Sequence, residues 1–307
     1  MMKTVTTLLA FLLIAQYSER YRNPEQSTEV MKAEQKPLFS FGIIADVQYC
    51  DCDTYNTRFY RNSPAKLMEA VNDLKSDSPA FIINLGDLID RDFRSFDPVL
   101  KILEDGGVKV YHTLGNHDYT VNAGDARKVA RITSSDKGYY SFIHEGFRFI
   151  VLNGNEIAKY APTSAGRKAG IQLLEELRSA GAVNAMDWNG ATGKAQMEWL
   201  RKELSRSGEA GEKVFIICHF PVWPEGTHNL LNWSEVLEVL SDYDHIVAWF
   251  NGHNHDGGYG NFNMIHFVTF RGMLETATEN SYALVEVYSN KLWIKGAGRE
   301  KSQILAY

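Results

Sequence analysis

Seven side chains of the kinds that hold metal ions stand directly after short apolar runs in this chain of 307 residues. They offer carboxylate, amide and imidazole groups, and they are Asp46, Gln48, Asp87, Asn116, His219, His253 and His255. Seven donors are enough for two ions that share one ligand. Because paired metal ions activate water and offset the charge of phosphate oxygens, this set predicts the hydrolysis of phosphate esters.

Asp87 is the candidate bridge between the two ions, because one carboxylate can give an oxygen to each. The other six donors form two sets: Asp46, Gln48 and His255 for the first ion, and Asn116, His219 and His253 for the second. Mixed oxygen and imidazole ligands favour Mn²⁺, Fe or Zn²⁺ over a pure Mg²⁺ or Ca²⁺ cage. The amide oxygen of Gln48 is harder than imidazole, and it shifts the expected preference at its position towards Mn²⁺ or Mg²⁺.

His117 follows the predicted ligand Asn116, and we expect its ring to point the other way. That position suits a general acid, and we expect the neighbouring Asp118 to orient the imidazole. Asp90 closes its own motif and is expected to orient metal ligands from outside the coordination sphere.

Apolar runs between these motifs predict strands that are buried on both faces, because they are short and rich in Ile, Val and Phe. The runs cover residues 39–45, 80–85, 108–114, 147–152, 214–218 and 246–250. In open α/β sheets, ligands bind outside the carboxyl ends of the strands. Since the predicted metal ligands follow these runs, we expect the strand ends to meet at one rim.

Helical patterns lie between several of the strands. Ser63-Pro64 and Asp97-Pro98 each place a proline in the first turn of a helix. Two further stretches have helical features, 193–207 and 232–240. This alternation predicts an α/β layered fold. After residue 260, short strands predict a β-rich C-terminal part, at 264–271, 282–288 and 292–295.

The predicted ligands span most of the chain, which favours a single domain at 38–307 after an N-terminal segment at 1–37. Within that segment, Lys3 precedes an apolar stretch at 6–15, as in a secretory signal. No small-residue cleavage site follows, and Met31 stands just before the first strand, so an upstream extension is the alternative. Export and a cytoplasmic location therefore both stay open. The apolar stretch is too short to span a bilayer comfortably.

The chain carries a net charge of −6. This charge disfavours nucleic acids and anionic membranes as partners, because both require a basic face.

Cys50, Cys52 and Cys218 are too few for a disulfide framework in a chain of this length. Cys50 and Cys52 stand too close in sequence for an easy bridge, and we expect them to be loop thiols near the rim of the site. The sequence makes no prediction of an oligomeric state.

The motifs resemble those of the calcineurin-like metallophosphoesterase superfamily, D-x-H, GD-x-x-D, GNH-[DE], a lone His and GH-x-H. Gln48 stands where most members have His. With that replacement, four segments resemble the manganese-dependent ADP-ribose/CDP-alcohol diphosphatases, namely 45–49, 57–61, 252–259 and 275–277. The resemblance covers residues 38–307.

The resemblance implies a four-layer αββα sandwich with two metal ions, Mn²⁺ first among them, at its upper edge. It implies a small-molecule substrate, a nucleoside diphosphate-X such as ADP-ribose or a CDP-alcohol. Cleavage of its diphosphate bond would give a nucleoside monophosphate and X-phosphate. Arg58 matches a family arginine that lies near the substrate.

We expect direct hydrolysis by a hydroxide that bridges the metals, because metal binding lowers the pKa of water to about 7. His117 would then protonate the leaving phosphate oxygen. One alternative is a phosphomonoesterase or cyclic-nucleotide phosphodiesterase on the same site. A second alternative is a metal-stabilised binding module without turnover, which the intact Asp87, Asn116 and His117 argue against.

Overall fold

The computed structural model describes residues 36–307 of the chain. Contacts group the chain into Met1–Pro37 and Leu38–Tyr307, and all of the described elements belong to the second group. The predictions for residues 1–30, a signal peptide or an upstream extension, lie outside the described residues. Within the part that is described, no helix is long and apolar enough to cross a membrane.

The first sheet has six strands in the order β14-β13-β12-β1-β2-β3. Their bounds are β1 Phe39–Ile44, β2 Ile82–Asn84, β3 Val110–His112, β12 Ser281–Val287, β13 Lys291–Gly298 and β14 Gln303–Ala306. Strands β1, β2 and β3 are parallel, whereas β12 runs antiparallel to β1 and pairs Val285 with Phe41. This sheet therefore combines the first three strands of the described residues with the last three.

The second sheet also has six strands, in the order β10-β11-β9-β8-β5-β4. Their bounds are β4 Tyr140–His144, β5 Phe147–Val151, β8 Lys213–Ile217, β9 Ile246–Asn251, β10 Gly258–Phe262 and β11 Ile265–Thr269. The four inner strands are parallel, and β4 and β10 run antiparallel at the two edges. A separate small pair joins β6 (Ile157–Ala158) to β7 (Gly190–Ala191).

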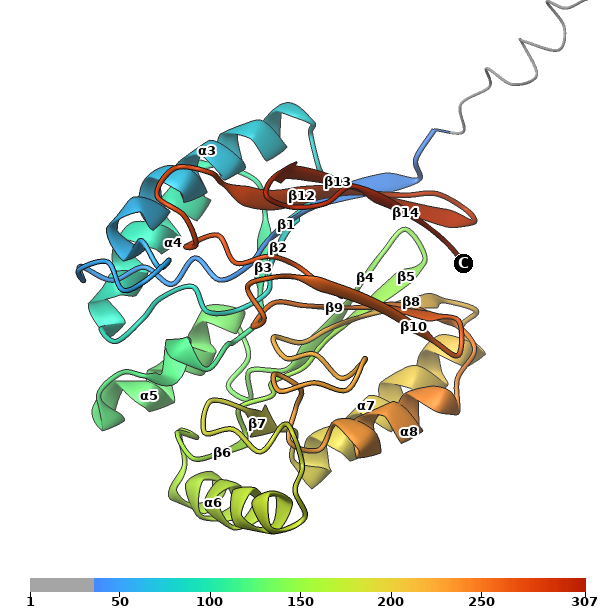
Figure 1. The fold of residues 1–307 in the computed structure, drawn as a ribbon. Helices are drawn as coiled ribbons and strands as arrows, with labels where there is room; N and C mark the ends of the chain where they lie inside the picture. The colour runs from blue at the N-terminus through green and yellow to red at the C-terminus, as the bar shows by residue number, and fades with distance from the viewer. Residues whose placement is uncertain (1–35) are drawn as a thin grey trace, which may run out of the picture. The chain divides into compact units, whose positions relative to one another are not determined.

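Helices cover the outer faces of the two sheets (Figure 1). Helices α3 (Ser63–Ser76) and α4 (Phe96–Asp105) pack on the first sheet. Helices α7 (Lys194–Glu209) and α8 (Trp233–Ser241) pack on the second. The layers therefore run helix, sheet, sheet, helix. Two more helices, α5 (Ala123–Val129) and α6 (Ser164–Ser179), lie apart from these two helical layers (Figure 1).

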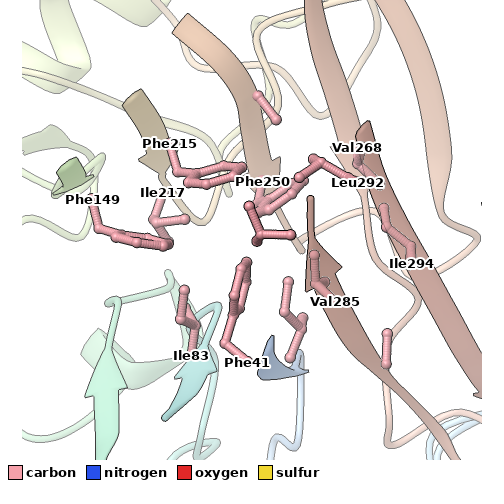
Figure 2. Packing of buried hydrophobic residues seen from close by; sticks show 14 of the residues in the cluster. Phe41, Ile83, Phe149, Phe215, Ile217, Phe250, Val268, Val285, Leu292 and Ile294 are labelled. Atoms are coloured by element: carbon pink, nitrogen blue, oxygen red, sulfur yellow. The ribbon is translucent and has the colours of Figure 1, made fainter. Parts of the chain in front are cut away.

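Alternate residues of the central strands face different layers. In β8, Phe215 and Ile217 join the core between the sheets, whereas Val214 and Ile216 join the core under α7 and α8. Figure 2 shows the core between the sheets, where the ring of Phe41 from the first sheet meets that of Phe215 from the second. Full burial of such a side chain contributes about 1.5–3 kcal/mol. Burial on both faces explains why these strands appear in the sequence as continuous apolar runs.

The strand predictions from apolar runs are confirmed, with ends that differ by at most two residues. The predicted C-terminal strands also occur, but they do not form a separate sheet. Strands β12, β13 and β14 extend the first sheet, and β10 and β11 extend the second. Helix α6 was not predicted, because its buried side consists only of Gly166, Gly170 and Leu174 and gives little apolar periodicity.

Candidate metal centre

Strand ends from both sheets bring the predicted ligands to one rim. Asp46 follows β1, Asp87 follows β2 and Asn116 follows β3 in the first sheet. His219 follows β8 and His253 follows β9 in the second. Side chains that are remote in sequence therefore meet where the carboxyl ends of parallel strands converge.

Asp87 lies at the centre of this cluster, with predicted ligands on both sides. On one side, its Oδ2 lies 3.2 Å from Nε2 of His219. That nitrogen lies 3.3 Å from Oδ1 of Asn116 and 3.2 Å from Nδ1 of His253. Donor atoms of Asp87, His219 and His253 all lie within 4.8 Å of one another, which is close enough for one ion to contact them.

On the other side, Oδ2 of Asp87 lies 3.1 Å from Nε2 of Gln48. The same Gln48 nitrogen lies 3.0 Å from Nε2 of His255, which lies 3.4 Å from Oδ1 of Asp46. The structure therefore brings together all seven predicted side chains. They fall into the two predicted sets, with Asp87 between them.

Each of the three clustered histidines has one ring nitrogen next to an oxygen outside the cluster. These oxygens are the carbonyl of Leu85 for His219 (2.8 Å), Oδ1 of Asn189 for His253 (2.9 Å) and Oε1 of Glu275 for His255 (2.7 Å). An N–H that donates to such an oxygen fixes the tautomer, so the other nitrogen carries a lone pair. In all three rings that other nitrogen faces the cluster. This orientation fits rings that bind cations.

The side-chain oxygen of Gln48 also fits a cation. Gln48 Oε1 is buried and has no hydrogen-bond partner. Leaving such an oxygen unpaired costs about 1–3 kcal/mol. Rotation of the amide by half a turn exchanges Oε1 with Nε2 and directs the oxygen between Asp87 and His255. A bound cation would satisfy the oxygen in that orientation.

Four of the seven side chains come from backbone positions in the left-handed region. Asp46, Gln48, Asp87 and His253 have φ angles of 53°, 43°, 53° and 68°. This conformation costs a non-glycine residue about 1–2 kcal/mol, and such costs concentrate at functional sites. The fold therefore supports locally unfavourable turns that aim these side chains at one point.

Glycines beside two of the predicted ligands permit a close approach between neighbouring strand ends. A β-carbon at Gly115 would lie 2.1 Å from Oδ1 of Asp87, and one at Gly252 would lie 2.5 Å from Oδ2 of Asp46. Neither gap can hold a methyl group, so each position excludes any larger residue while the carboxylate stays in place.

Buried carboxylates make the cluster attractive to positive charge. Burial alone would raise the pKa of Asp87, but His219 and His117 hold it below its ordinary range. Burial lowers the pKa of His219, yet Asp87 more than offsets this effect and raises it to about 9. Asp46 likewise outweighs burial and raises the pKa of His255 to about 9. The field that favours protons here also favours divalent cations, which compete with protons for the same ligands.

His117 is oriented by Asp90 rather than by Asp118. Nδ1 of His117 lies 3.0 Å from Oδ1 of Asp90. The buried carboxylate of Asp118 accepts hydrogen bonds from the backbone N–H groups of Asp87, Leu88, Ile89 and Gly115. The prediction that Asp118 orients His117 is therefore wrong. Adjacent side chains of the short 3-10 helix His117–Tyr119 point in different directions, and that of Asp118 turns inward to hold the loop after β2.

The prediction for two cysteines is also wrong. Cys50 and Cys52 form a disulfide, whereas the sequence suggested two free loop thiols. The chain bends at Asp51, and the two Cα atoms lie 5.2 Å apart. That separation is within the ordinary range for a bridge, so short sequence spacing alone does not exclude one.

Comparison with known proteins agrees with this geometry. Residues 39–257 match the family model for calcineurin-like phosphoesterases. The chain belongs to the calcineurin-like phosphoesterase family. The manganese-dependent ADP-ribose/CDP-alcohol diphosphatase of Xenopus tropicalis is 30% identical to this phosphoesterase, over 90% of the chain and 96% of the relative. The protein of the same name from Arabidopsis thaliana is also 30% identical, over 88% of the chain and 97% of the relative.

A solved structure supports the same assignment. The crystal structure of a dimetal phosphatase from Danio rerio is 26% identical in sequence to this phosphoesterase, with a TM-score of 0.79. The match covers 89% of this chain and 100% of that one. These comparisons confirm the predicted family and the predicted layered α/β fold.

Two cavities adjoin the candidate metal centre of the phosphoesterase. The first has a volume of about 470 Å³, and its wall includes Thr120, Tyr160 and Trp188. The second has a volume of about 450 Å³, and its wall includes Tyr55 and Asp256. Four residues line both cavities: Arg58, His228, His253 and His255. The predicted substrate-binding arginine therefore lies at the junction of the two cavities.

Several wall residues were not recognised in the sequence. The hydroxyl of Tyr160 lies 3.1 Å from both Oδ1 of Asn155 and the carbonyl oxygen of Trp188, and its single proton is shared between these two acceptors. No strand end or metal motif precedes Trp188. Its pairing with Tyr160 depends on tertiary structure, which local patterns do not contain.

Proposed function

We propose that this phosphoesterase hydrolyses the diphosphate bond of nucleoside diphosphate-X compounds, such as ADP-ribose and CDP-alcohols. The products would be a nucleoside monophosphate and X-phosphate, and two Mn²⁺ ions would be required. The names of the curated relatives support both the substrate class and the metal. The family and the clustered ligands support a hydrolase that works with metal ions.

The observation that carries this proposal is the junction of two cavities at the metal centre. A nucleoside diphosphate-X has a bulky group on each side of its diphosphate and needs two adjoining cavities. A phosphomonoester needs only one. Arg58 and His228 line both cavities and so flank the point where the diphosphate would cross. A guanidinium group suits that position, because it binds phosphate oxygens in a bidentate manner.

The seven clustered side chains would coordinate the two ions as two sets that share one carboxylate. The first ion would be held by Asp46, Gln48 and His255, the second by Asn116, His219 and His253, and Asp87 would contact both. When bound, the two ions lower the pKa of water and offset charge on the phosphate oxygens. The oxygens that contact His219, His253 and His255 from outside keep the ring nitrogens aimed at the ions.

His117 would donate the proton that the leaving phosphate oxygen needs. Asp90 holds its Nδ1, which leaves Nε2 for the substrate. Burial lowers the pKa of His117, but the charges of Asp87 and Asp90 more than offset this and raise it above the ordinary value. A raised pKa favours the protonated ring, which is the form that a general acid needs.

A substrate panel with product identification by mass spectrometry tests the proposal. The panel should contain ADP-ribose, CDP-choline, a cyclic nucleotide and a phosphomonoester, each with added Mn²⁺. CMP and phosphocholine in equal amounts from CDP-choline are the expected result. Free phosphate as the first product would contradict the proposal and assign the site to a phosphomonoesterase. Two bound Mn²⁺ ions per chain without turnover of any substrate would identify a binding module.

A further inference from the structure

Lys66 in helix α3 is only 4% exposed, although it carries an ammonium group. Its Nζ donates hydrogen bonds to three backbone carbonyls, those of Met273, Glu275 (2.9 Å) and Thr276 (3.1 Å). An ammonium group has three N–H donors, so Lys66 uses all of them on one short segment. Burial of a charge is costly unless it is compensated in this way. Lys66 therefore anchors residues 273–276.

The anchored segment runs between the two loops that supply the site. Leu274 N–H donates to the carbonyl of Asp46 at 3.1 Å. Thr276 N–H donates to the carbonyl of Thr57 at 3.0 Å, next to Arg58. Residues 273–276 thus connect the backbone of a predicted metal ligand with that of the predicted substrate-binding arginine.

Glu275 projects from the middle of this segment into the site. Its Oε1 lies 2.7 Å from Nδ1 of His255 and 4.0 Å from Nε of Arg58. The backbones of Arg58 and Glu275 also pair in an isolated antiparallel bridge. The side chain is 12% exposed, so water competes little for its oxygens. One carboxylate therefore contacts a predicted metal ligand and lies near the predicted substrate-binding side chain.

We propose that Glu275 is a positioning residue that aims Nε2 of His255 at the first metal ion and holds Arg58 over the substrate, and that Lys66 acts through it. A carboxylate that accepts the Nδ1–H of a metal-binding histidine fixes its tautomer and strengthens its lone pair. This inference rests on the proposed function only in taking His255 as a ligand and Arg58 as a substrate contact. Lys66 in helix α3 would thus influence a metal site that it does not touch.

Mn²⁺ titration of the full chain by calorimetry tests the role of Glu275 without any need for turnover. Glu275→Ala should weaken one of the two Mn²⁺ sites by about 10- to 100-fold and leave the other unchanged. Lys66→Met should weaken the same site in the same direction. Glu275→Gln keeps an oxygen that can accept the Nδ1–H, and it should recover part of the affinity. Glu279→Ala and Lys101→Met are the matched controls, because both side chains are exposed and neither lines the two cavities.

Steady-state kinetics on CDP-choline provide a second measurement. Glu275→Ala should raise KM as well as lower kcat, because Arg58 loses the carboxylate near its guanidinium. Unchanged affinity at both Mn²⁺ sites in Glu275→Ala would overturn the inference. Equal weakening of both sites together with a lower melting temperature would also overturn it, since that result indicates a purely structural role. A wild-type chain that binds two Mn²⁺ ions but cleaves no nucleotide would contradict the proposed function and leave the titration interpretable.

Discussion

Nδ1 of His117 lies 3.0 Å from Oδ1 of Asp90, although the two residues belong to different motifs on different strand ends. The carboxylate is almost fully buried, so water does not replace it as the partner of the ring. The hydroxyl of Thr120 lies 3.2 Å from the same oxygen and 2.7 Å from the carbonyl oxygen of His117, so it lies between the two residues. Because Asp90 holds Nδ1, Nε2 is the ring nitrogen of His117 that the proposed general-acid role would use.

His117→Ala should lower kcat on CDP-choline by about 10²- to 10⁴-fold, because it removes the proposed general acid. Mn²⁺ binding should stay at the wild-type level, since His117 is not among the proposed ligands. Asp90→Asn should give a smaller loss of kcat, because the ring remains but its charged partner is gone. A kcat for His117→Ala within a factor of about three of wild type would disprove the general-acid assignment.

Asp118→Ala should destabilise the protein by about 3 kcal/mol or more. The substitution leaves the N–H groups of Asp87, Leu88, Ile89 and Gly115 without their common acceptor, and each unsatisfied group costs about 1–3 kcal/mol. Urea denaturation measures the loss. Asp125→Ala is the control, because its partly exposed ion pair with Lys128 contributes at most about 1 kcal/mol. Equal stability of the two variants would contradict the structural role of Asp118.

Gln48→His should change the metal preference of the centre. The substitution replaces a hard amide oxygen with an imidazole nitrogen, which favours Zn²⁺ and Fe over Mn²⁺. The measurement is the ratio of the Kd values for Mn²⁺ and Zn²⁺ in the wild type and in the variant. This ratio should shift towards Zn²⁺ by about tenfold or more, which corresponds to about 1.4 kcal/mol. An unchanged ratio would indicate that Gln48 does not contact a bound ion.

Glu203→Gln should reduce stability near neutral pH and have little effect in acid. The Glu203 carboxylate accepts hydrogen bonds from Arg148 and Ser141 at 2.8 Å and 2.6 Å. Burial opposes its charge, but Ser141 and Arg148 outweigh burial and lower the pKa of Glu203 below its ordinary value of 4.5. A lowered folded-state pKa stabilises the protein above about pH 4.5, and this contribution disappears as pH falls through the folded-state value.

Denaturation of wild type and Glu203→Gln at pH 7 and at pH 4 measures this dependence. At pH 7 the wild type should be more stable than Glu203→Gln by up to about 3 kcal/mol. The loss should not exceed this value, because Arg148 keeps its second partner, Glu212. It should shrink at pH 4. A difference that grows towards acid would contradict the proposed sign.

The parallel strands, and the rim at which the seven predicted ligands gather, could be predicted because each depends on local sequence. Runs such as 214–218 are apolar throughout since both of their faces are buried, and the ligands follow the ends of such runs. The same logic located helix α7 from its apolar stripe. It did not place β14, whose exposed Ile304 and polar Gln303 break any simple alternation.

Within the candidate site, the residue types predicted which side chains gather but not the contacts that orient them. His117 and Asp118 are adjacent in sequence, yet Asp90 is the partner of the ring. Glu275 meets His255 only because the segment after β11 folds back over the end of β1. Contacts of this kind depend on the packing of distant segments, and they leave no spacing in the sequence.

Anomalous diffraction at the manganese edge, from crystals of the full chain grown with Mn²⁺, tests the central claim most directly. Two peaks should appear, one beside Asp46, Gln48 and His255 and the other beside Asn116, His219 and His253, with the carboxylate of Asp87 between them. A single peak, or two peaks that do not share Asp87, would contradict a two-ion centre built from these seven side chains.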